Sequence, residues 1–244
     1  MVRFSLLLAL LCGVAHAAAA LPTGHAEYAV SWNGIPAGAA TVAVRHGGSE
    51  IPSAYRVDAF LRTNKLVDLL WRFRGHATAE FSSGDLRPLG FQYDRHENAK
   101  HAVTDVLFDS TLTRATGVYH RDADLRRMES REPGILDPIT AIFQALDRPV
   151  QIGDSWRYEI FTGEARYRVE LTVVGEDTIT VAAGRFRAWR VNPDVWKIGS
   201  GPDQRLRRAT VWVAEDSTRL PLRIRSEVFI GAVDCDLIHI QAAP

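Results

Sequence analysis

The arrangement that most resembles a metal site is a polar segment with a histidine at each end, His96-Glu97-Asn98-Ala99-Lys100-His101. Zinc proteases with a His-Glu-x-x-His motif place two histidines four positions apart, so that both imidazoles lie on one face of a helix. Here the two histidines are five positions apart, and the flanking residues alternate as they do in strands. The segment therefore predicts a polar hairpin connection.

The other histidines give no further support for a metal site. Two ligands on one strand would be two positions apart, and two on a helix would be three or four positions apart. Neither spacing occurs among the histidines beyond residue 17, which are His25, His46, His76, His96, His101, His120 and His239. A site assembled from distant strands stays open, but the sequence itself predicts no metal site.

The sequence carries no signature of covalent or phosphate chemistry. It contains no Gly-x-Ser-x-Gly elbow, and the glycine-rich stretch 199–202 is not followed by a helix whose N-terminus would hold a phosphate. Cys235 lies between Asp234 and Asp236, which raise the pKa of a thiol, so we interpret it as a small strand residue. We assign no catalytic residue and expect no cofactor.

Aromatic, basic and acidic side chains are the remaining candidates for binding. Tryptophans on a sheet stack on sugars or line a lipid cavity, although filling the core is the more frequent role of any one. A row of Arg72, Arg74 and His76 would bind an anionic head group or form a solvated face. The acid pairs Asp122/Asp124 and Asp234/Asp236 are typical of solvated surface. No ligand-binding residue is assigned. The tryptophans are Trp32, Trp71, Trp156, Trp189, Trp196 and Trp212.

Apolar and polar residues alternate with a period of two through most of the chain, which is the pattern of half-buried strands. The clearest example is 69–81, where Trp71, Phe73 and Phe81 fall on one face and the charged residues on the other. Asn33-Gly34 predicts a tight hairpin turn. We predict a mostly β fold, either a strongly curved antiparallel sheet or an open β-barrel.

Residues 137–147 break this period and predict one short helix. Asp137 followed by Pro138 is typical of an N-cap and the first helical position. The positions i, i+3, i+4 and i+7 are then apolar, which gives a single stripe on about three turns. We expect this helix to pack on the concave side of the sheet. The stripe consists of Ile139, Ile142, Phe143 and Leu146.

The first 17 residues have the organisation of an export signal. Arg3 precedes an apolar run, and Ala15-His16-Ala17 presents small residues at the two positions that a signal peptidase recognises. The apolar run is shorter than the roughly 20 residues that span a bilayer. We expect cleavage after Ala17 and a periplasmic location. A lipid anchor at Cys12 is disfavoured because Leu11 is large where lipid attachment needs a small residue.

Composition and charge exclude several classes of protein. Lys and Arg total 29 and Asp and Glu total 29, so the chain lacks the basic excess of a nucleic-acid-binding protein. No later segment reaches the length of a membrane span. After cleavage Cys235 is the sole cysteine, so the core must be held by apolar packing. Because no linker divides the chain, 18–244 is expected to form one domain.

Seven segments spread along the chain form a recognisable set. They are 28–38 (Tyr-Ala-Val-Ser-Trp-Asn-Gly-Ile-Pro-Ala-Gly), Phe108-Asp109, the helix 137–146, Gly153-Asp154, 181–186, 211–222 and Gly231. Together they resemble the bacterial DUF3108 family, a domain of unknown function, over about residues 27–240. The stretch 211–222 is the most specific. The resemblance implies an exported protein with an antiparallel β-rich fold, and it transfers no catalytic residue.

Three kinds of function fit these features. The first is a non-catalytic binding or carrier protein for an envelope lipid or glycan, held in an apolar groove between the sheet and the helix. The second is an enzyme that acts on envelope glycans or lipids with a site built from separate strands. The third is a scaffold subunit of an envelope complex, which would expose an apolar patch. Because no catalytic set is found, we favour the first.

Overall fold

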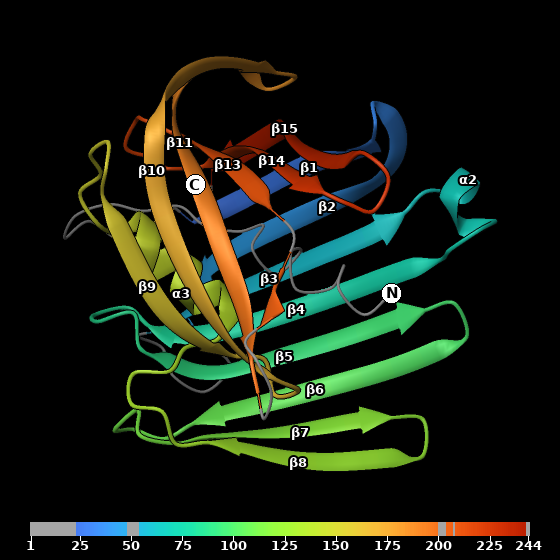
Figure 1. Cartoon of the computed structure of the whole chain (residues 1–244), viewed down its shortest axis with the longest axis vertical. Coiled ribbons are helices and arrows are strands. Elements are labelled where there is room, and N and C mark those ends of the chain that lie inside the picture. Colours follow the sequence, from blue (N-terminus) through green and yellow to red (C-terminus); the bar gives the residue numbers. More distant parts are fainter. Residues whose placement is uncertain (1–22, 48–53, 200–203, 207, 243–244) are drawn as a thin grey trace.

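A single antiparallel sheet contains all the strands of the described residues and curves into a nearly closed barrel (Figure 1). The computed structural model describes residues 23–47, 54–199, 204–206 and 208–242, and the expected leader 1–17 with Cys12 lies outside these ranges. Fourteen strands follow one another in the order β8-β7-β6-β5-β4-β3-β2-β1-β15-β14-β13-β11-β10-β9, and β12 pairs only with β11. The predicted open barrel is confirmed.

The N-terminal half is a meander in which each strand pairs with the next along the chain. The predicted long strand 69–81 begins later, at Phe73, because Lys65–Asp68 forms a short helix, α2. Asn64 caps α2 by accepting a hydrogen bond from the Val67 amide at 2.9 Å. The strands are β1 (Gly24–Trp32), β2 (Ile35–His46), β3 (Ala54–Thr63), β4 (Phe73–Ser82), β5 (Pro88–Glu97), β6 (Lys100–Phe108), β7 (Ala115–Arg121) and β8 (Asp124–Ser130).

The C-terminal half contains a long hairpin and then returns to the start of the chain. Gly175, which resembles a turn residue in the sequence, lies at a β-bulge inside β10, so β10 and β11 continue past it. β15 pairs with β1 and thereby joins the two halves. The strands are β9 (Ser155–Phe161), β10 (Arg166–Val181), β11 (Gly184–Ile198), β12 (Gln204–Arg205), β13 (Ala209–Ala214), β14 (Pro221–Glu227) and β15 (Ala232–Ala242).

Helix α3 (Pro138–Leu146) lies on the concave side of the sheet, as predicted (Figure 1). The Asp137 carboxylate caps it by accepting hydrogen bonds from the amides of Ile139 and Thr140, both at 2.9 Å. All of its residues except Gln144 are buried. The Phe143 ring packs against Phe81 of β4, with ring centroids 5.0 Å apart. The helix therefore fills the barrel interior between its two halves.

The barrel has a seam between the terminal strands β8 and β9, which are not paired in the described residues. Leu136 covers part of the edge of β9 through a parallel bridge to Ile160. The turn between β9 and β10 instead lies against the inner face of the N-terminal half. There Glu164 accepts a hydrogen bond from Arg95 of β5 at 3.0 Å. Docking of this turn, rather than strand pairing, holds the two halves of the barrel together at this seam.

Candidate functional site

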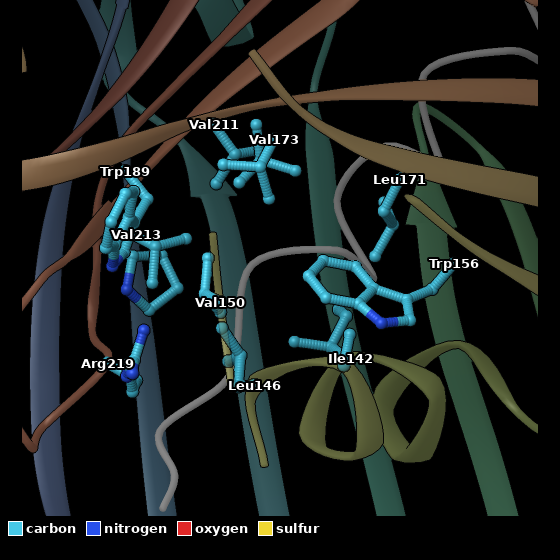
Figure 2. A pocket seen from close by; sticks show the side chains of 13 residues that line it. Ile142, Leu146, Val150, Trp156, Leu171, Val173, Trp189, Val211, Val213 and Arg219 are labelled. Carbon is cyan, nitrogen blue, oxygen red and sulfur yellow. The ribbon is translucent and has the colours of Figure 1, made fainter. Parts of the chain in front are cut away.

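An apolar cavity lies between α3 and the C-terminal strands (Figure 2). The cavity is a trough open to solvent, with an interior volume of about 60 Å³, or about 620 Å³ when all the empty space between its walls and the adjoining solvent is counted. The lining comes from α3, β9, β10, β11, β13, β14 and the loops beside them, and it is almost entirely carbon. Ile142 and Leu146 form the helix side, Trp156 and Leu171 lie at one end, and Trp189 and Val213 lie at the other.

Arg219 is the charged residue of this lining. It sits in the β13–β14 connection with a φ of +49°, a left-handed conformation that is unusual for a residue with a side chain. Its Nε and Nη1 atoms are buried and have no hydrogen-bond partner among the described residues. The same is true of the indole nitrogen of Trp189, at the same end of the cavity (Figure 2). This end therefore offers unused donors beside an apolar trough.

Such an arrangement suits a molecule with an apolar body and an acceptor-rich or anionic end. Apolar walls gain from the burial of alkyl groups, and buried donors without partners gain from any acceptor that reaches them. No nucleophile or acid–base pair lines the cavity in the described part of the chain. The arrangement can bind and orient a ligand, and the ionisable group that it presents is a permanent cation.

The tryptophans divide between the core, this cavity and the surface. Three of them, Trp71, Trp156 and Trp212, are half-buried and pack against the core clusters, so core filling describes half of the six. Trp156 and Trp189 line the cavity. Trp212 packs beside the core and donates its indole N–H to Asp177 at 2.7 Å. Trp32 is exposed at the end of β1. The sequence identified the residue type but not which tryptophans would meet.

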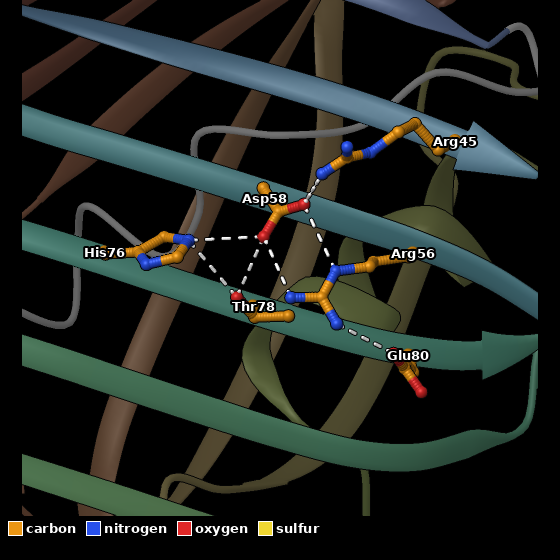
Figure 3. A network of polar contacts seen from close by, with 6 residues as sticks. All are labelled: Arg45, Arg56, Asp58, His76, Thr78 and Glu80. Carbon is orange, nitrogen blue, oxygen red and sulfur yellow. Dashed lines mark hydrogen bonds and ion pairs between the residues drawn. The ribbon is translucent and has the colours of Figure 1, made fainter. Parts of the chain in front are cut away.

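A polar network on the outer face of β2–β4 is the main cluster of charged groups on the N-terminal half (Figure 3). Asp58 is buried at its centre and accepts hydrogen bonds from Arg45, from Arg56 at 3.3 Å and from Thr78 at 3.0 Å. His76 Nε2 lies 3.2 Å from the same carboxylate. Burial raises the pKa of Asp58, but the hydrogen bonds from Arg56, Arg45, Thr78 and His76 outweigh it and lower the pKa to about 2.

Two of the three residues in the predicted basic row already contact carboxylates of the protein itself. His76 is engaged by Asp58, and Arg74 binds Asp68 of α2 at 2.5 Å. Of the row, Arg72 is the exposed member, and it forms no ion pair with the acids of the described residues. Arg72, Arg74 and His76 therefore do not form a shared anion site. They are better described as part of a solvated face of the sheet, on which Arg74 and His76 contact neighbouring carboxylates.

The predicted hairpin around His96 and His101 is confirmed, since the turn connects β5 to β6. The two histidines lie directly opposite each other, and their rings stack with centroids 3.9 Å apart. Asp94 Oδ1 lies 2.9 Å from His101 Nε2 and 3.7 Å from His96 Nε2. One ligand atom from each residue lies within 4.8 Å of the others, so among the described residues this is the group that could hold a metal ion. Spacing along one element does not reveal it, because the two histidines meet across strands.

Cys235 and the two acids beside it take structural roles. Cys235 is buried in β15, and this burial is the largest cause that raises the pKa of its thiol. The negative charges of Asp236 and Asp234 raise the pKa further. Both neighbouring acids form ion pairs, Asp236 with Arg223 and Asp234 with Arg225. The interpretation of Cys235 as a small strand residue is confirmed, and this acid pair is not a pair of free carboxylates.

The comparison with family models decides the relationship of the chain. The model for a protein of unknown function, DUF3108, matches residues 27–238. The chain belongs to the DUF3108 family. This confirms the resemblance seen in the separate sequence segments. No curated protein matches this DUF3108 sequence.

Solved structures resemble this DUF3108 chain to different degrees, all at low sequence identity. A β-barrel-like protein of the domain of unknown function DUF1849 from Brucella abortus superposes with a TM-score of 0.60 and 8% identity, covering 92% of this chain and 99% of its own. A protein from Bacteroides fragilis, described as exported with a YmcC-like fold, gives 0.41 and 10%, covering 94% and 100%. One from Parabacteroides distasonis, described as a lipoprotein, gives 0.41 and 11%, covering 90% and 95%. The first likeness supports the barrel fold alone.

Among the helices of the described residues, neither α2 nor α3 has the length and apolar character needed to cross a membrane.

Proposed function

We propose that this DUF3108 protein is a non-catalytic binding or carrier protein of the bacterial periplasm whose ligand is an anionic amphiphile with a single alkyl chain. The alkyl chain would lie in the trough between α3 and the C-terminal strands. The anionic head would accept hydrogen bonds from Arg219 and Trp189. The observation that carries the proposal is a pair of buried guanidinium nitrogens, Nε and Nη1 of Arg219, which have no partner among the described residues and lie at one end of a carbon-lined cavity.

The lining favours a lipid over a glycan as the ligand. A sugar needs a hydrogen-bond partner for most of its hydroxyl groups, whereas the lining of the cavity is almost entirely carbon. An interior volume of about 60 Å³ leaves no room for the two chains of a diacyl lipid and would bury a short part of one alkyl chain, the rest of which would lie in the open trough. The leader expected at residues 1–17 supports a periplasmic location, where such envelope lipids are available.

Native mass spectrometry and a fluorescent fatty acid test the proposal. The mature protein is purified without detergent, and any co-purifying amphiphile is identified by mass. Binding of cis-parinaric acid is then measured by fluorescence, with oleate, oleyl alcohol and a soluble oligosaccharide as competitors. We expect displacement by oleate, weaker displacement by the uncharged alcohol, and none by the oligosaccharide.

The variant Arg219→Gln separates the head-group contact from the cavity. A charge-assisted hydrogen bond contributes about 1.5–3 kcal/mol, so we expect the affinity for oleate to fall about 10- to 100-fold while that for oleyl alcohol changes little. Arg185→Gln is the matched control, because Arg185 is exposed on β11 outside the lining. If wild-type protein neither carries nor binds an amphiphile, or if Arg219→Gln binds oleate as tightly as wild type, the proposal fails.

A further inference from the structure

One end of the barrel carries a concentration of exposed apolar side chains. The connections β1–β2, β3–β4 and β14–β15 all lie at this end, because β4, β3, β2, β1, β15 and β14 are successive neighbours in the sheet (Figure 1). Leu70, Phe229 and Leu69 expose 89%, 85% and 81% of their surface. We call the whole set the apolar edge; it consists of Trp32, Ile35, Leu66, Leu69, Leu70, Phe229 and Ile230.

Hydrogen bonds hold the three connections to one another. The indole N–H of Trp32 donates to the Ile230 carbonyl at 2.8 Å. The Asn33 side chain accepts from the Ala232 amide at 2.9 Å. On the other side, the Asn64 side chain donates to the Pro36 carbonyl at 2.6 Å. The apolar edge is therefore a connected surface built on strand ends, and its side chains are exposed.

The charges beside the apolar edge are mainly positive on the side of α2. Arg62, Lys65, Arg72 and Lys100 are exposed there. The acid of α2, Asp68, is engaged by Arg74 at 2.5 Å. Glu227 is an exposed acid at the β14–β15 connection, on the other side. Leucine and aromatic side chains flanked by lysine and arginine are typical of surfaces that insert into the interface of an anionic bilayer.

We propose that the apolar edge docks this protein onto an anionic lipid bilayer, with the leucines and Phe229 entering the interface and the α2-side cations meeting the head groups. The proposal is independent of the cavity, which lies against α3 and the C-terminal strands. Docking of this kind needs no membrane-spanning segment. It would bring an exported protein to the surface of a membrane while the barrel remains in water.

Vesicle flotation tests the proposal with the mature chain. Vesicles of phosphatidylglycerol and phosphatidylethanolamine are compared with vesicles of phosphatidylcholine, at low and high salt. We expect binding to the anionic vesicles, reduced at high salt because salt screens the contribution of the cations. The double variant Leu69→Ser/Leu70→Ser should lose at least 10-fold in partition. Phe229→Ser/Ile230→Ser should do the same from a different loop, should one variant fail to fold.

Leu107→Ser is the matched control, since Leu107 is 70% exposed on β6 outside the apolar edge. It should bind vesicles like wild type. Absence of vesicle binding by wild type, or equal binding by the two double variants and wild type, overturns the proposal. A dimer that both double variants dissociate, without vesicle binding, would instead assign the apolar edge to a second copy. Retention of another protein through the edge without vesicle binding would overturn it in favour of the scaffold interpretation.

The cross-strand histidines carry a second inference on independent grounds. His96 and His101 occupy facing positions of β5 and β6, and Asp94 lies two residues earlier on the same outer face. Two imidazole nitrogens and one carboxylate oxygen are ligands that Zn²⁺, Ni²⁺ and Cu²⁺ accept. We infer that this group is a surface site for a divalent transition-metal ion, with water completing the coordination. The stacked rings would tilt so that both Nε2 atoms face the ion.

Titration with each metal alone tests this site. We expect one equivalent of Zn²⁺ or Cu²⁺ to bind with micromolar or tighter affinity, and Cu²⁺ to show two nitrogen ligands by electron paramagnetic resonance. His101→Gln should weaken binding at least 10-fold. His120→Gln is the control, because His120 is exposed on β7 outside the group. Binding that is weaker than about 100 µM, or unchanged by His101→Gln, overturns the inference.

Discussion

Adding one methyl group to the turn between β9 and β10 should show how the barrel is closed. A Cβ atom on Gly163 would lie 2.3 Å from Thr104 Cγ2 and 2.9 Å from Val106 Cγ2, and the φ of Gly163 is +79°. Both neighbours are buried on the inner face of β6. The turn has no room to move inward, so the variant Gly163→Ala must lift it from the sheet or push β6 outward.

The size of the effect follows from two separate contributions. A left-handed backbone conformation costs a residue with a side chain about 1–2 kcal/mol relative to glycine. Overpacking in a buried contact costs about 1–3 kcal/mol more. We therefore expect Gly163→Ala to lower the free energy of unfolding by about 2–5 kcal/mol. Gly134→Ala should lose only the first contribution, because Gly134 has a φ of +71° and a Cβ atom added there would meet no described atom within 4 Å.

Urea unfolding followed by circular dichroism measures both variants, with linear extrapolation to water. Gly117→Ala gives a second approach to the same contact, since its Cβ atom would lie 2.5 Å from the Gly163 Cα atom. Because the two glycines touch, the double variant should lose less than the sum of the single variants. If Gly163→Ala is no less stable than Gly134→Ala, then the turn does not close the barrel in the way described.

Three further predictions concern buried ionisable groups. Burial raises the pKa of Asp137 to about 6, so the folded state binds the carboxyl proton more tightly than the unfolded state does. About 3 kcal/mol of stability that is present below pH 4 is therefore lost as the pH rises to about 6. Urea unfolding at a series of pH values should show that Asp137→Asn removes this pH dependence. The pH dependence has the opposite sign for Asp58, whose pKa is lowered to about 2 in the folded state. Its carboxylate contributes about 1–2 kcal/mol to the free energy of unfolding above pH 4, and this contribution is lost as the pH falls toward 2. Asp58→Asn should therefore reduce the loss of stability in acid. The Cys235 thiol should resist a maleimide in native protein and react in urea, as measured on its peptide by mass spectrometry, and native reactivity would contradict its burial.

The sequence predicted the fold well where a local pattern and the tertiary structure agree. Helix α3 could be placed because its N-cap, its proline and its apolar stripe all indicate the same element. The alternation within 73–81 holds in the structure because β4 has one buried face. Helix α2 escapes prediction because four residues are too few to show a helical period, and the leucines beside it continue the strand pattern of β4.

The candidate sites were harder to predict because each is assembled across strands. Gly175 has the sequence neighbours of a turn residue, but the register shift between Val173 and Gly175 keeps it within the sheet. The two histidines of the β5–β6 hairpin meet because of their register, which spacings along one helix or one strand do not test. The cavity lining comes from strands that the sequence separates widely, and each segment alone shows only ordinary apolar residues.

Arg219 is the residue at which a structural role explains least. In a sequence it is one arginine in a polar turn, and a solvated position would be the ordinary expectation. In the fold it combines a left-handed backbone with two buried nitrogens that lack partners among the described residues. The left-handed backbone belongs to a hydrogen-bonded turn, in which the Arg219 amide donates to the Asp216 carbonyl at 3.2 Å. The two unpaired nitrogens cost free energy that no described contact offsets, and an acceptor on a ligand would supply the missing contacts. Because Arg219 also borders the apolar cavity, the anionic head group proposed above would account for these two nitrogens.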